Sequence, residues 1–332
     1  MKHSQTGKMK DKILEVQNLK KSYNGFVAVD EIDFEIKRAE IFGFLGPNGA
    51  GKTTTINMLI GMVKVTSGKI FYNETDLTRN IKKAQEMIGV VPDESNLYNE
   101  MSGFDNLCFC GSLYGLKKKK REKRASELLE LFKLSDVAGK KFKAYSKGMK
   151  RKLTIAAALI HKPEILFLDE PTSGIDLASV RQIRNLIREL NETGTTIFLT
   201  THYIEEAERL CHRVAFIHKG QIIRNDSVQN LSAQSRTING IEIRYQPNGK
   251  NHTHILQTLT NKFPGFDCRQ MNDDTIKIIS EKTIDIAPVV SFLSEKGLFI
   301  YEAKLLKPSL EEAFVKATGI EIDILKKEKE KR

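Results

Sequence analysis

Alternating apolar and polar positions at the start of the chain predict two antiparallel strands within residues 13–36. The period-two pattern around Val16 returns from 32 to 36, as expected of half-buried strands. Asn24-Gly25 lies between the two runs and is a strong turn signal. The chain is therefore predicted to open with a β-hairpin.

Unbroken apolar runs further along predict a different kind of strand. They occupy residues 41–45, 165–168 and 197–199. Continuous runs are typical of parallel strands that are covered on both faces. Helical spacing follows the first run at 53–62 and separates the other two at 177–190. Strands that alternate with helices favour a doubly wound α/β core around a parallel sheet.

Two further segments complete this first domain. Residues 95–145 lack strand-like runs and are rich in Leu, Lys and Glu, so they are predicted to form a helical insertion. Two apolar runs on either side of Lys219-Gly220 predict a closing hairpin. We place the domain at residues 13–235.

The pattern changes near residue 236 and predicts a second, smaller domain over 236–325. Its strands and helices are predicted at 241–245 (strand), 252–263 (helix), 267–271 (strand), 275–280 (strand), 286–296 (helix) and 298–306 (strand). This order is typical of a small ferredoxin-like α+β module. A last helix is expected at 309–318, and residues 1–12 and 326–332 are charged tails.

Composition narrows the class of protein. The chain has 332 residues, of which 40% are hydrophobic and 29% charged, so it can build a packed core. The longest apolar runs, such as 155–160, are far shorter than the roughly 18 residues that cross a bilayer. The N-terminus lacks the apolar core of a secretory signal, and four scattered Cys do not form a disulfide framework. A reducing, cytosolic compartment fits these features.

The net charge of +11 suggests nucleic-acid binding at first sight. The charge is concentrated, however, in two short stretches: 1–12 carries a net +3, and 116–124 carries seven basic residues against one acidic. The rest of the first domain is neutral. Local patches of this kind do not make a groove-wide field, so no nucleic-acid partner is expected.

Residues 46–53 read Gly-Pro-Asn-Gly-Ala-Gly-Lys-Thr and match the Walker A pattern G-x-x-x-x-G-K-[ST] between a predicted strand and a predicted helix. Glycines let backbone N–H groups approach phosphates without a Cβ in the way. Lys52 can reach the β- and γ-phosphates, and Thr53 can coordinate Mg²⁺. The candidate nucleotide-binding residues of this loop are Gly46, Pro47, Asn48, Gly49, Ala50, Gly51, Lys52, Thr53 and Thr54.

The apolar run at 165–168 ends in Asp169 and Glu170. Next to a phosphate-binding loop, the first carboxylate is expected to hold Mg²⁺ through water, and the second to polarise the attacking water. A strand end that carries solvated acids is the alternative, and the Walker A sequence upstream makes it the minority reading.

Together with two more segments, these motifs resemble those of the ATP-binding cassette (ABC) ATPases. Residues 145–150 resemble the family's signature loop, just before a helix predicted at 151–161. Ser146, Gly148 and Met149 are its candidate contacts to the γ-phosphate of ATP held by the opposite subunit. His202 ends a segment similar to the switch loop, whose His contacts the γ-phosphate. The resemblance implies a P-loop NTPase fold with a parallel core sheet, an antiparallel β subdomain and a helical subdomain.

Smaller matches agree with this resemblance, and one position departs from it. Residues 173–176 are similar to the D-loop, which crosses the dimer interface, and Tyr23 corresponds to the aromatic residue that stacks on adenine. The family usually has Gln after the strand that ends at Pro92, and this chain has Asp93. Aspartate can still ligate a hard cation, so Asp93 is kept as a candidate Mg²⁺ ligand.

The resemblance also implies how the protein works. One cassette carries one Walker A loop and one signature loop, which do not complete the same site, so two cassettes sandwich two ATP molecules. Hydrolysis would use Lys52, Glu170 and His202 as catalytic residues. The smaller domain resembles the accessory domain of drug- and antibiotic-export ATPases of type-2 systems, with a generic α+β appendage as the alternative.

Two functions follow as hypotheses. The first is the ATPase subunit of an exporter that drives a separate permease chain from the inner face of the cell membrane. The basic stretch 117–124 would then lie near the anionic leaflet, although a solvated helix face explains it equally well. The second is a soluble ABC ATPase that acts on the ribosome or on nucleic acid, which usually has two cassettes or long coiled coils.

Overall fold

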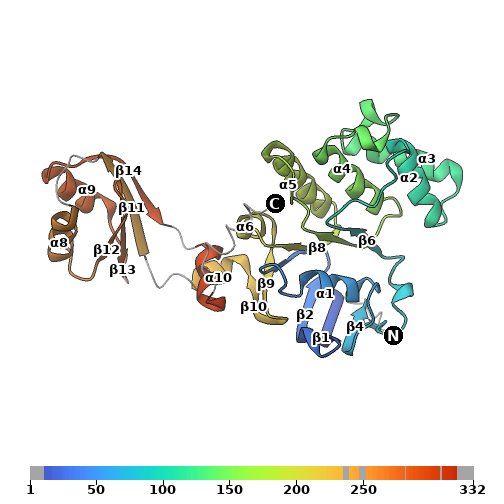
Figure 1. Ribbon diagram of the computed structural model, residues 1–332, viewed down its shortest axis with the longest axis horizontal. Coiled ribbons are helices and arrows are strands. Elements are labelled where there is room, and N and C mark those ends of the chain that lie inside the picture. The colour runs from blue at the N-terminus through green and yellow to red at the C-terminus, as the bar shows by residue number, and fades with distance from the viewer. Residues whose placement is uncertain (1–10, 235–238, 247–251, 281, 307–308, 320–332) are drawn as a thin grey trace, which may run out of the picture. The chain divides into compact units, whose positions relative to one another are not determined.

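The computed structural model describes residues 11–234, 239–246, 252–280, 282–306 and 309–319 (Figure 1). Contacts divide the chain into two compact units, residues 1–228 with 317–332, and residues 229–316. The predicted tail 326–332, most of the predicted tail 1–12 and the predicted boundary at 236 lie outside the described residues.

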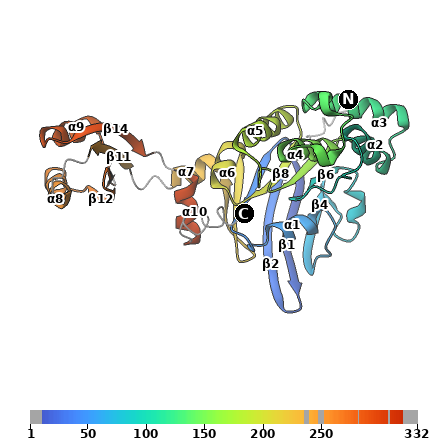
Figure 2. The ribbon, with the colours of Figure 1, turned by 45° about the horizontal axis from the view of Figure 1, so that its top comes forward.

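An antiparallel sheet forms the first part of the large unit. Its strands are β1 (Lys12–Tyr23), β2 (Phe26–Lys37), β4 (Ser67–Tyr72) and β5 (Thr75–Asp76), in the order β2-β1-β4-β5. The predicted hairpin is confirmed, because Tyr23 pairs with Phe26 across the Asn24-Gly25 turn. It is the long ribbon of Figure 2. The sequence pattern did not predict β4 and β5.

A six-stranded sheet forms the centre of the large unit, in the order β10-β9-β3-β8-β7-β6. Its strands are β3 (Ile41–Leu45), β6 (Ile88–Val91), β7 (Ile165–Asp169), β8 (Thr196–Thr201), β9 (Arg213–His218) and β10 (Gln221–Ser227). The neighbouring strands β9, β3, β8, β7 and β6 run parallel, and β10 pairs antiparallel with β9. The predicted parallel core and its closing hairpin are thus confirmed.

An aromatic cluster joins the two sheets. Phe34 of β2 stacks on Phe42 of β3, with 5.6 Å between the ring centroids, and also contacts Phe44 and Phe198. All four rings are buried. Aromatic rings carry a large apolar area, so this cluster fixes the antiparallel sheet against the strands that carry the phosphate-binding loop.

The predicted helical insertion is present, and its helices lie together in the green part of Figure 1. The helices of the large unit are α1 (Lys52–Leu59), α2 (Gly103–Leu113), α3 (Lys118–Leu131), α4 (Lys147–Ala158), α5 (Leu177–Glu192) and α6 (Ile204–Leu210), with short 3₁₀ turns at Ile81–Lys83, Ser135–Val137 and Phe142–Ala144. Helix α7 (Val228–Gln234) begins with the last residue of this stretch and otherwise belongs to the second unit. Two predicted helices have the wrong bounds. The helix predicted at 53–62 is Lys52–Leu59, and the helix predicted at 151–161 is Lys147–Ala158.

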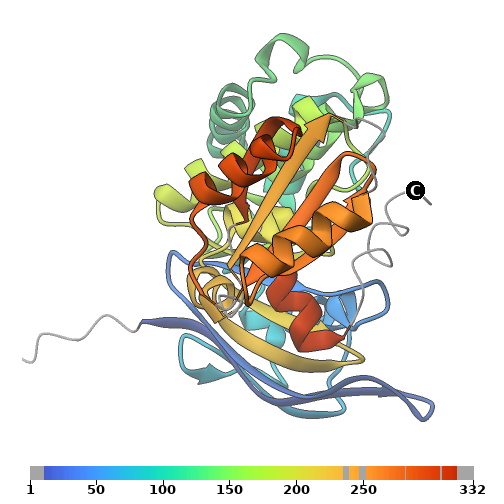
Figure 3. The same ribbon diagram turned by 90° about the vertical axis from the view of Figure 1, so that its left-hand side faces the viewer.

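The small unit is a four-stranded antiparallel sheet in the order β12-β13-β11-β14. Its elements are β11 (Asn239–Gln246), α8 (His252–Lys262), β12 (Asp267–Asn272), β13 (Thr275–Ser280), α9 (Ile286–Glu295) and β14 (Phe299–Leu306), followed by α10 (Leu310–Thr318). Helices α8 and α9 cover one face of the sheet (Figure 3). The predicted ferredoxin-like topology is confirmed. Within the described residues, no helix is long and apolar enough to cross a membrane.

Candidate active site

The candidate site lies at the carboxyl ends of three neighbouring parallel strands. Leu45 of β3 pairs with Thr201 of β8, and Thr200 of β8 pairs with Asp169 of β7. Loops after parallel strands emerge at the same edge of a sheet, which is where open α/β sheets bind ligands. This register brings together the Walker A loop after β3, the two carboxylates at the end of β7 and His202 after β8.

Two glycines give the Walker A loop its shape. Gly49 and Gly51 have φ values of +77° and +107°, a backbone region that residues with a Cβ rarely adopt. A Cβ on Gly51 would lie 2.7 Å from the carbonyl oxygen of Ala28, whereas a Cβ on Gly49 would meet nothing within 4 Å. Helix α1 begins directly after Gly51, so its free N–H groups face the loop.

This difference predicts unequal stability effects of two matched substitutions. Gly49→Ala should cost about 1–2 kcal/mol of unfolding free energy, the usual penalty for a left-handed L-residue. Gly51→Ala should cost at least about 1 kcal/mol more, since backbone must shift to admit the methyl group. Urea unfolding of both variants without nucleotide measures the difference. Equal midpoints would show that the close approach to Ala28 does not constrain the loop.

Lys52 is buried, and its ammonium group is held by the loop itself. Its Nζ donates hydrogen bonds to the carbonyl oxygens of Gly46 at 2.8 Å and Pro47 at 3.2 Å. It also lies 3.4 Å from a carboxylate oxygen of Glu170. A buried cation is tolerated only with such partners, and this one stands where phosphate oxygens would bind.

Asp169 links the Walker A helix to β8. Its carboxylate accepts a hydrogen bond from the Thr53 hydroxyl at 3.2 Å and a second from the Thr200 hydroxyl. The Thr200 hydroxyl in turn accepts from the backbone N–H of Glu170 at 3.2 Å. Thr53 and Asp169, both predicted metal ligands, are therefore adjacent. Thr200 is a positioning residue that the sequence analysis missed.

Glu170 and His202 form a buried pair. The Nδ1 of His202 lies 2.8 Å from a carboxylate oxygen of Glu170, and both side chains are less than a tenth exposed. Burial would raise the pKa of the Glu170 carboxyl, but the hydrogen bond with His202 and the charge of Lys52 outweigh it and leave this pKa below its ordinary value. The carboxylate is therefore ionised at neutral pH, and it accepts the hydrogen bond that Nδ1 of His202 donates.

The backbone of Glu170 is held on both sides by Arg151 of α4. This buried guanidinium donates to the carbonyl oxygens of Asp169 at 2.6 Å and Pro171 at 2.9 Å, the residues directly before and after Glu170. Glu170 itself has a φ of +47°, which is unusual for a residue with a side chain. Burial lowers the pKa of Arg151, opposed by the nearby Asp93 and Asp169. The sequence analysis did not single out Arg151.

The signature residues lie at the N-terminus of α4. Ser146 caps the helix, and its hydroxyl accepts a hydrogen bond from the backbone N–H of Met149 at 3.2 Å. Gly148 packs so closely on α5 that an added Cβ would lie 2.1 Å from the hydroxyl oxygen of Ser179. Asp176 of the predicted D-loop caps α5. Ser146 is exposed, and so available to a second chain.

Two predicted residues lie at the margins of this group. Tyr23 ends β1 and is 43% exposed, with the Lys21 ammonium 4.6 Å from its ring centroid. Asp93 is exposed in the loop after β6, and its backbone carbonyl accepts a hydrogen bond from Arg151 at 3.0 Å. Their roles as adenine platform and Mg²⁺ ligand stay predictions.

The arrangement fits a nucleoside triphosphate with a divalent cation. The Nε2 of His202 is buried and has no hydrogen-bond partner among the described residues. With a proton on both ring nitrogens, Nε2 would donate a hydrogen bond to a phosphate oxygen. Within the described residues, no group of three or more His, Cys, Asp or Glu side chains could hold a metal ion. Mg²⁺ commonly takes one or two protein oxygens and completes its shell with phosphates and water. Thr53 and Asp169 supply such a pair.

Comparison with known proteins decides the family. Residues 29–173 match the sequence profile described as ABC transporter. The chain is 37% identical over 316 residues to the linearmycin resistance ATP-binding protein LnrL of Bacillus subtilis (strain 168), across 92% of this chain and 98% of that protein. It is 32% identical to the bacitracin transport ATP-binding protein BcrA of Bacillus licheniformis, across 92% and 97%. The chain belongs to the ATP-binding proteins of ABC transporters.

Solved structures of this family share the fold. CbiO1 from Clostridium perfringens, part of the ABC transporter complex CbiONQ, aligns over 77% of this chain and 97% of its own, with 27% identity and a TM-score of 0.63. A dimeric ATP-binding cassette in a post-hydrolysis state with ADP and Pi aligns over 64% and 98%, with 26% identity and a TM-score of 0.59. The chain is an ATP-binding and ATP-hydrolysing subunit of an ABC transporter.

Proposed function

We propose that two such cassettes close head to tail around two ATP molecules. The supporting observation is the division of the predicted site within one chain. The Walker A loop, Glu170 and His202 meet at one edge of the parallel sheet, while Ser146 is exposed at the start of α4. The helix N-terminus at Ser146 is a second place where backbone N–H groups can meet phosphate. A related cassette is dimeric with ADP and Pi.

In this proposal the Walker A loop binds the triphosphate. The N–H groups at the start of α1 and the ammonium of Lys52 stabilise the negative charge on the phosphates. On binding, Lys52 would exchange its contacts with the loop carbonyls of Gly46 and Pro47 for phosphate oxygens. Tyr23 would stack on the adenine ring.

Thr53 and Asp169 would hold Mg²⁺, with Asp93 as a further candidate ligand. A cation held there would neutralise charge on the phosphate oxygens while the terminal phosphoryl group is transferred to water. The Thr200 hydroxyl fixes one oxygen of the Asp169 carboxylate, so the other oxygen, which contacts Thr53, is the one free to turn toward a cation.

Glu170 would orient and polarise the attacking water. Its carboxylate is ionised, is buried, and is held by His202 and Lys52. His202 would contact the γ-phosphate through Nε2, the atom that has no partner among the described residues. Fixed groups of this kind act by positioning the water and by stabilising charge.

We further propose that the subunit drives a separate permease from the inner face of the cell membrane and exports an antibiotic-like compound. The support is the agreement over nearly the whole chain with one relative named for linearmycin resistance and one for bacitracin transport. Both alignments extend through the ferredoxin-like unit, and not only through the cassette.

An export role predicts a change in drug sensitivity. A host whose copy of this gene encodes Glu170→Gln should show a severalfold lower inhibitory concentration of at least one compound in a panel that includes bacitracin and linearmycin. The substitution removes the water-polarising carboxylate and keeps the fold intact. Glu164→Gln, at the other end of β7, is the control. Unchanged sensitivity across the panel would contradict export and leave the ATPase assignment in place.

A further inference from the structure

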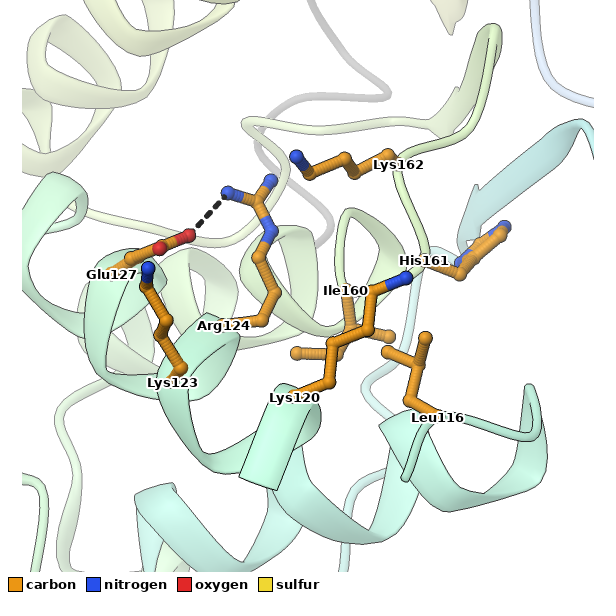
Figure 4. Close-up of a pocket in the computed structure, with 8 residues that line it drawn as sticks. All are labelled: Leu116, Lys120, Lys123, Arg124, Glu127, Ile160, His161 and Lys162. Carbon is orange, nitrogen blue, oxygen red and sulfur yellow. Dashed lines mark hydrogen bonds and ion pairs between the residues drawn. The ribbon is translucent and has the colours of Figure 1, made fainter. Parts of the chain in front are cut away.

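A basic cavity of about 240 Å³ lies in the helical subdomain, apart from the candidate active site. It is formed where α3 passes the loop that follows α4 (Figure 4). Leu116 and Ile160 make an apolar wall, and most of the other lining side chains are charged. Nothing in the proposed hydrolysis of ATP uses this cavity.

The cavity has a strong excess of positive charge. Its lining includes the cations Lys120, Lys123, Arg124 and Lys162, with Glu127 as the one lining carboxylate. Glu127 forms an ion pair with Arg124, with 3.2 Å between a carboxylate oxygen and a guanidinium nitrogen. In the part of the chain that the structure describes, no carboxylate lies within ion-pair distance of the three lysines.

The cations come from two separate elements that border one cavity. Lys162 extends from the loop after α4 toward the guanidinium of Arg124, while Lys120 and Lys123 lie on α3 on different sides of the view (Figure 4). Arg124 is anchored by Glu127 and by the carbonyl oxygen of Leu159 at 3.5 Å, and its Nε is buried without a hydrogen-bond partner in the described residues. Like charges that line one cavity repel each other, and a bound anion would relieve that repulsion.

We infer that this cavity binds a phosphomonoester. Three unpaired ammonium groups match the charge of a dianion better than that of a carboxylate or another monoanion. A phosphate group presents three oxygens that accept charge-assisted hydrogen bonds from different directions, which suits donors from two elements. The wall of Leu116 and Ile160 would contact the carbon skeleton next to the phosphate.

The same chemistry occurs in two sources, a free phosphorylated metabolite and the headgroup of an anionic lipid. The probes are therefore glycerol 3-phosphate in solution and vesicles of phosphatidylcholine with and without phosphatidic acid, whose headgroup is a phosphomonoester. All measurements use the full chain saturated with Mg-ADP, so that the Walker A loop is already occupied, at one fixed salt concentration.

Two double variants with the same loss of charge make the test specific. Lys120→Gln with Lys162→Gln removes two lining cations from opposite sides. Lys118→Gln with Lys119→Gln removes two cations from the same helix that do not line the cavity. Binding of at least one probe should fall about tenfold or more in the first variant, the scale of losing two charge-assisted contacts, and should stay within about twofold in the second.

The outcomes separate the sources. If the first double variant binds glycerol 3-phosphate more weakly, the ligand is a free metabolite. If it binds only the phosphatidic acid vesicles more weakly, the ligand is a lipid headgroup. Either result supports the site. Equal losses in the two double variants would show diffuse surface charge and overturn it. No binding of either probe to the wild-type chain would overturn it as well. Unfolding midpoints of both variants establish that the chains compared are folded.

Discussion

Replacing Glu170 with Gln should abolish nearly all ATP hydrolysis while ATP still binds. Gln has the same shape, and its amide oxygen can still accept the hydrogen bond from His202 Nδ1. It has no carboxylate to polarise water, and general acid–base groups contribute about 10²–10⁴-fold to rates, so turnover should fall by at least about 100-fold. Phosphate release measures the rate, and equilibrium dialysis measures ATP binding. Normal turnover would refute the role of Glu170.

The same variant should trap an ATP-bound dimer, which size-exclusion chromatography with light scattering detects. Glu164→Gln is a matched control, because it makes the same change directly before β7, where the exposed carboxylate pairs with Arg38 at 2.9 Å. That control should hydrolyse ATP normally and should not accumulate dimer.

Mixing two inactive variants tests whether each site is shared between chains. Ser146→Asp keeps a good helix cap but places a negative charge at the proposed phosphate contact. In a dimer of one Ser146→Asp chain and one Glu170→Gln chain, one of the two sites has both native groups. Random mixing makes about half of the dimers mixed, so it should restore up to about a quarter of the wild-type rate. Ser146→Asn, a neutral cap, controls for loss of the hydroxyl. No recovery on mixing would contradict sites that are shared between two chains.

The sequence predicted the local structure of the motifs from which the candidate site is built. The Walker A loop could be predicted because a left-handed glycine and a helix start are encoded within eight residues. The order of the second unit was predictable because strand and helix periods alternate cleanly there. In both cases the information is local, and tertiary packing adds little to it.

The parts that failed depend on contacts between distant segments. Thr200 matters because β8 pairs in register with β7, and register between parallel strands is set by the packing of the whole sheet. Strand β4 begins with Ser-Gly-Lys, a poor strand former, and is recruited by pairing with β1. The predicted start of α4 was four residues late, so the cap at Ser146 and the first turn of the helix were missed.

Arg151 is the clearest example of a residue whose role only the fold reveals. It stands among Lys147, Lys150 and Lys152, and by composition all four belong to one basic stretch. In the structure Arg151 is 7% exposed, and its guanidinium binds backbone carbonyls after β6 and on both sides of Glu170. A planar group with several fixed donors can hold such separate acceptors at once, and an ammonium group cannot.

Replacing Arg151 with Met should therefore weaken both the fold and catalysis. The substitution keeps an unbranched side chain of similar length but leaves the carbonyl oxygens of Asp93, Asp169 and Pro171 without this donor. Leaving buried polar groups unpaired should cost on the order of 3 kcal/mol. That loss lowers the melting temperature by roughly 6–12 °C in a unit of this size.

The catalytic effect should be separable from the loss of stability. Below the melting transition, kcat should fall at least about tenfold, because Glu170 is no longer fixed on both sides, while the KM for ATP changes little since the Walker A loop is untouched. Arg151→Lys should recover part of the stability but little of kcat, because one ammonium group cannot replace the several fixed donors of the planar guanidinium. Lys152→Met, the same loss of charge one residue later, should leave kcat within about twofold of wild type. A normal kcat in folded Arg151→Met would show that the guanidinium supports the fold alone and does not position Glu170.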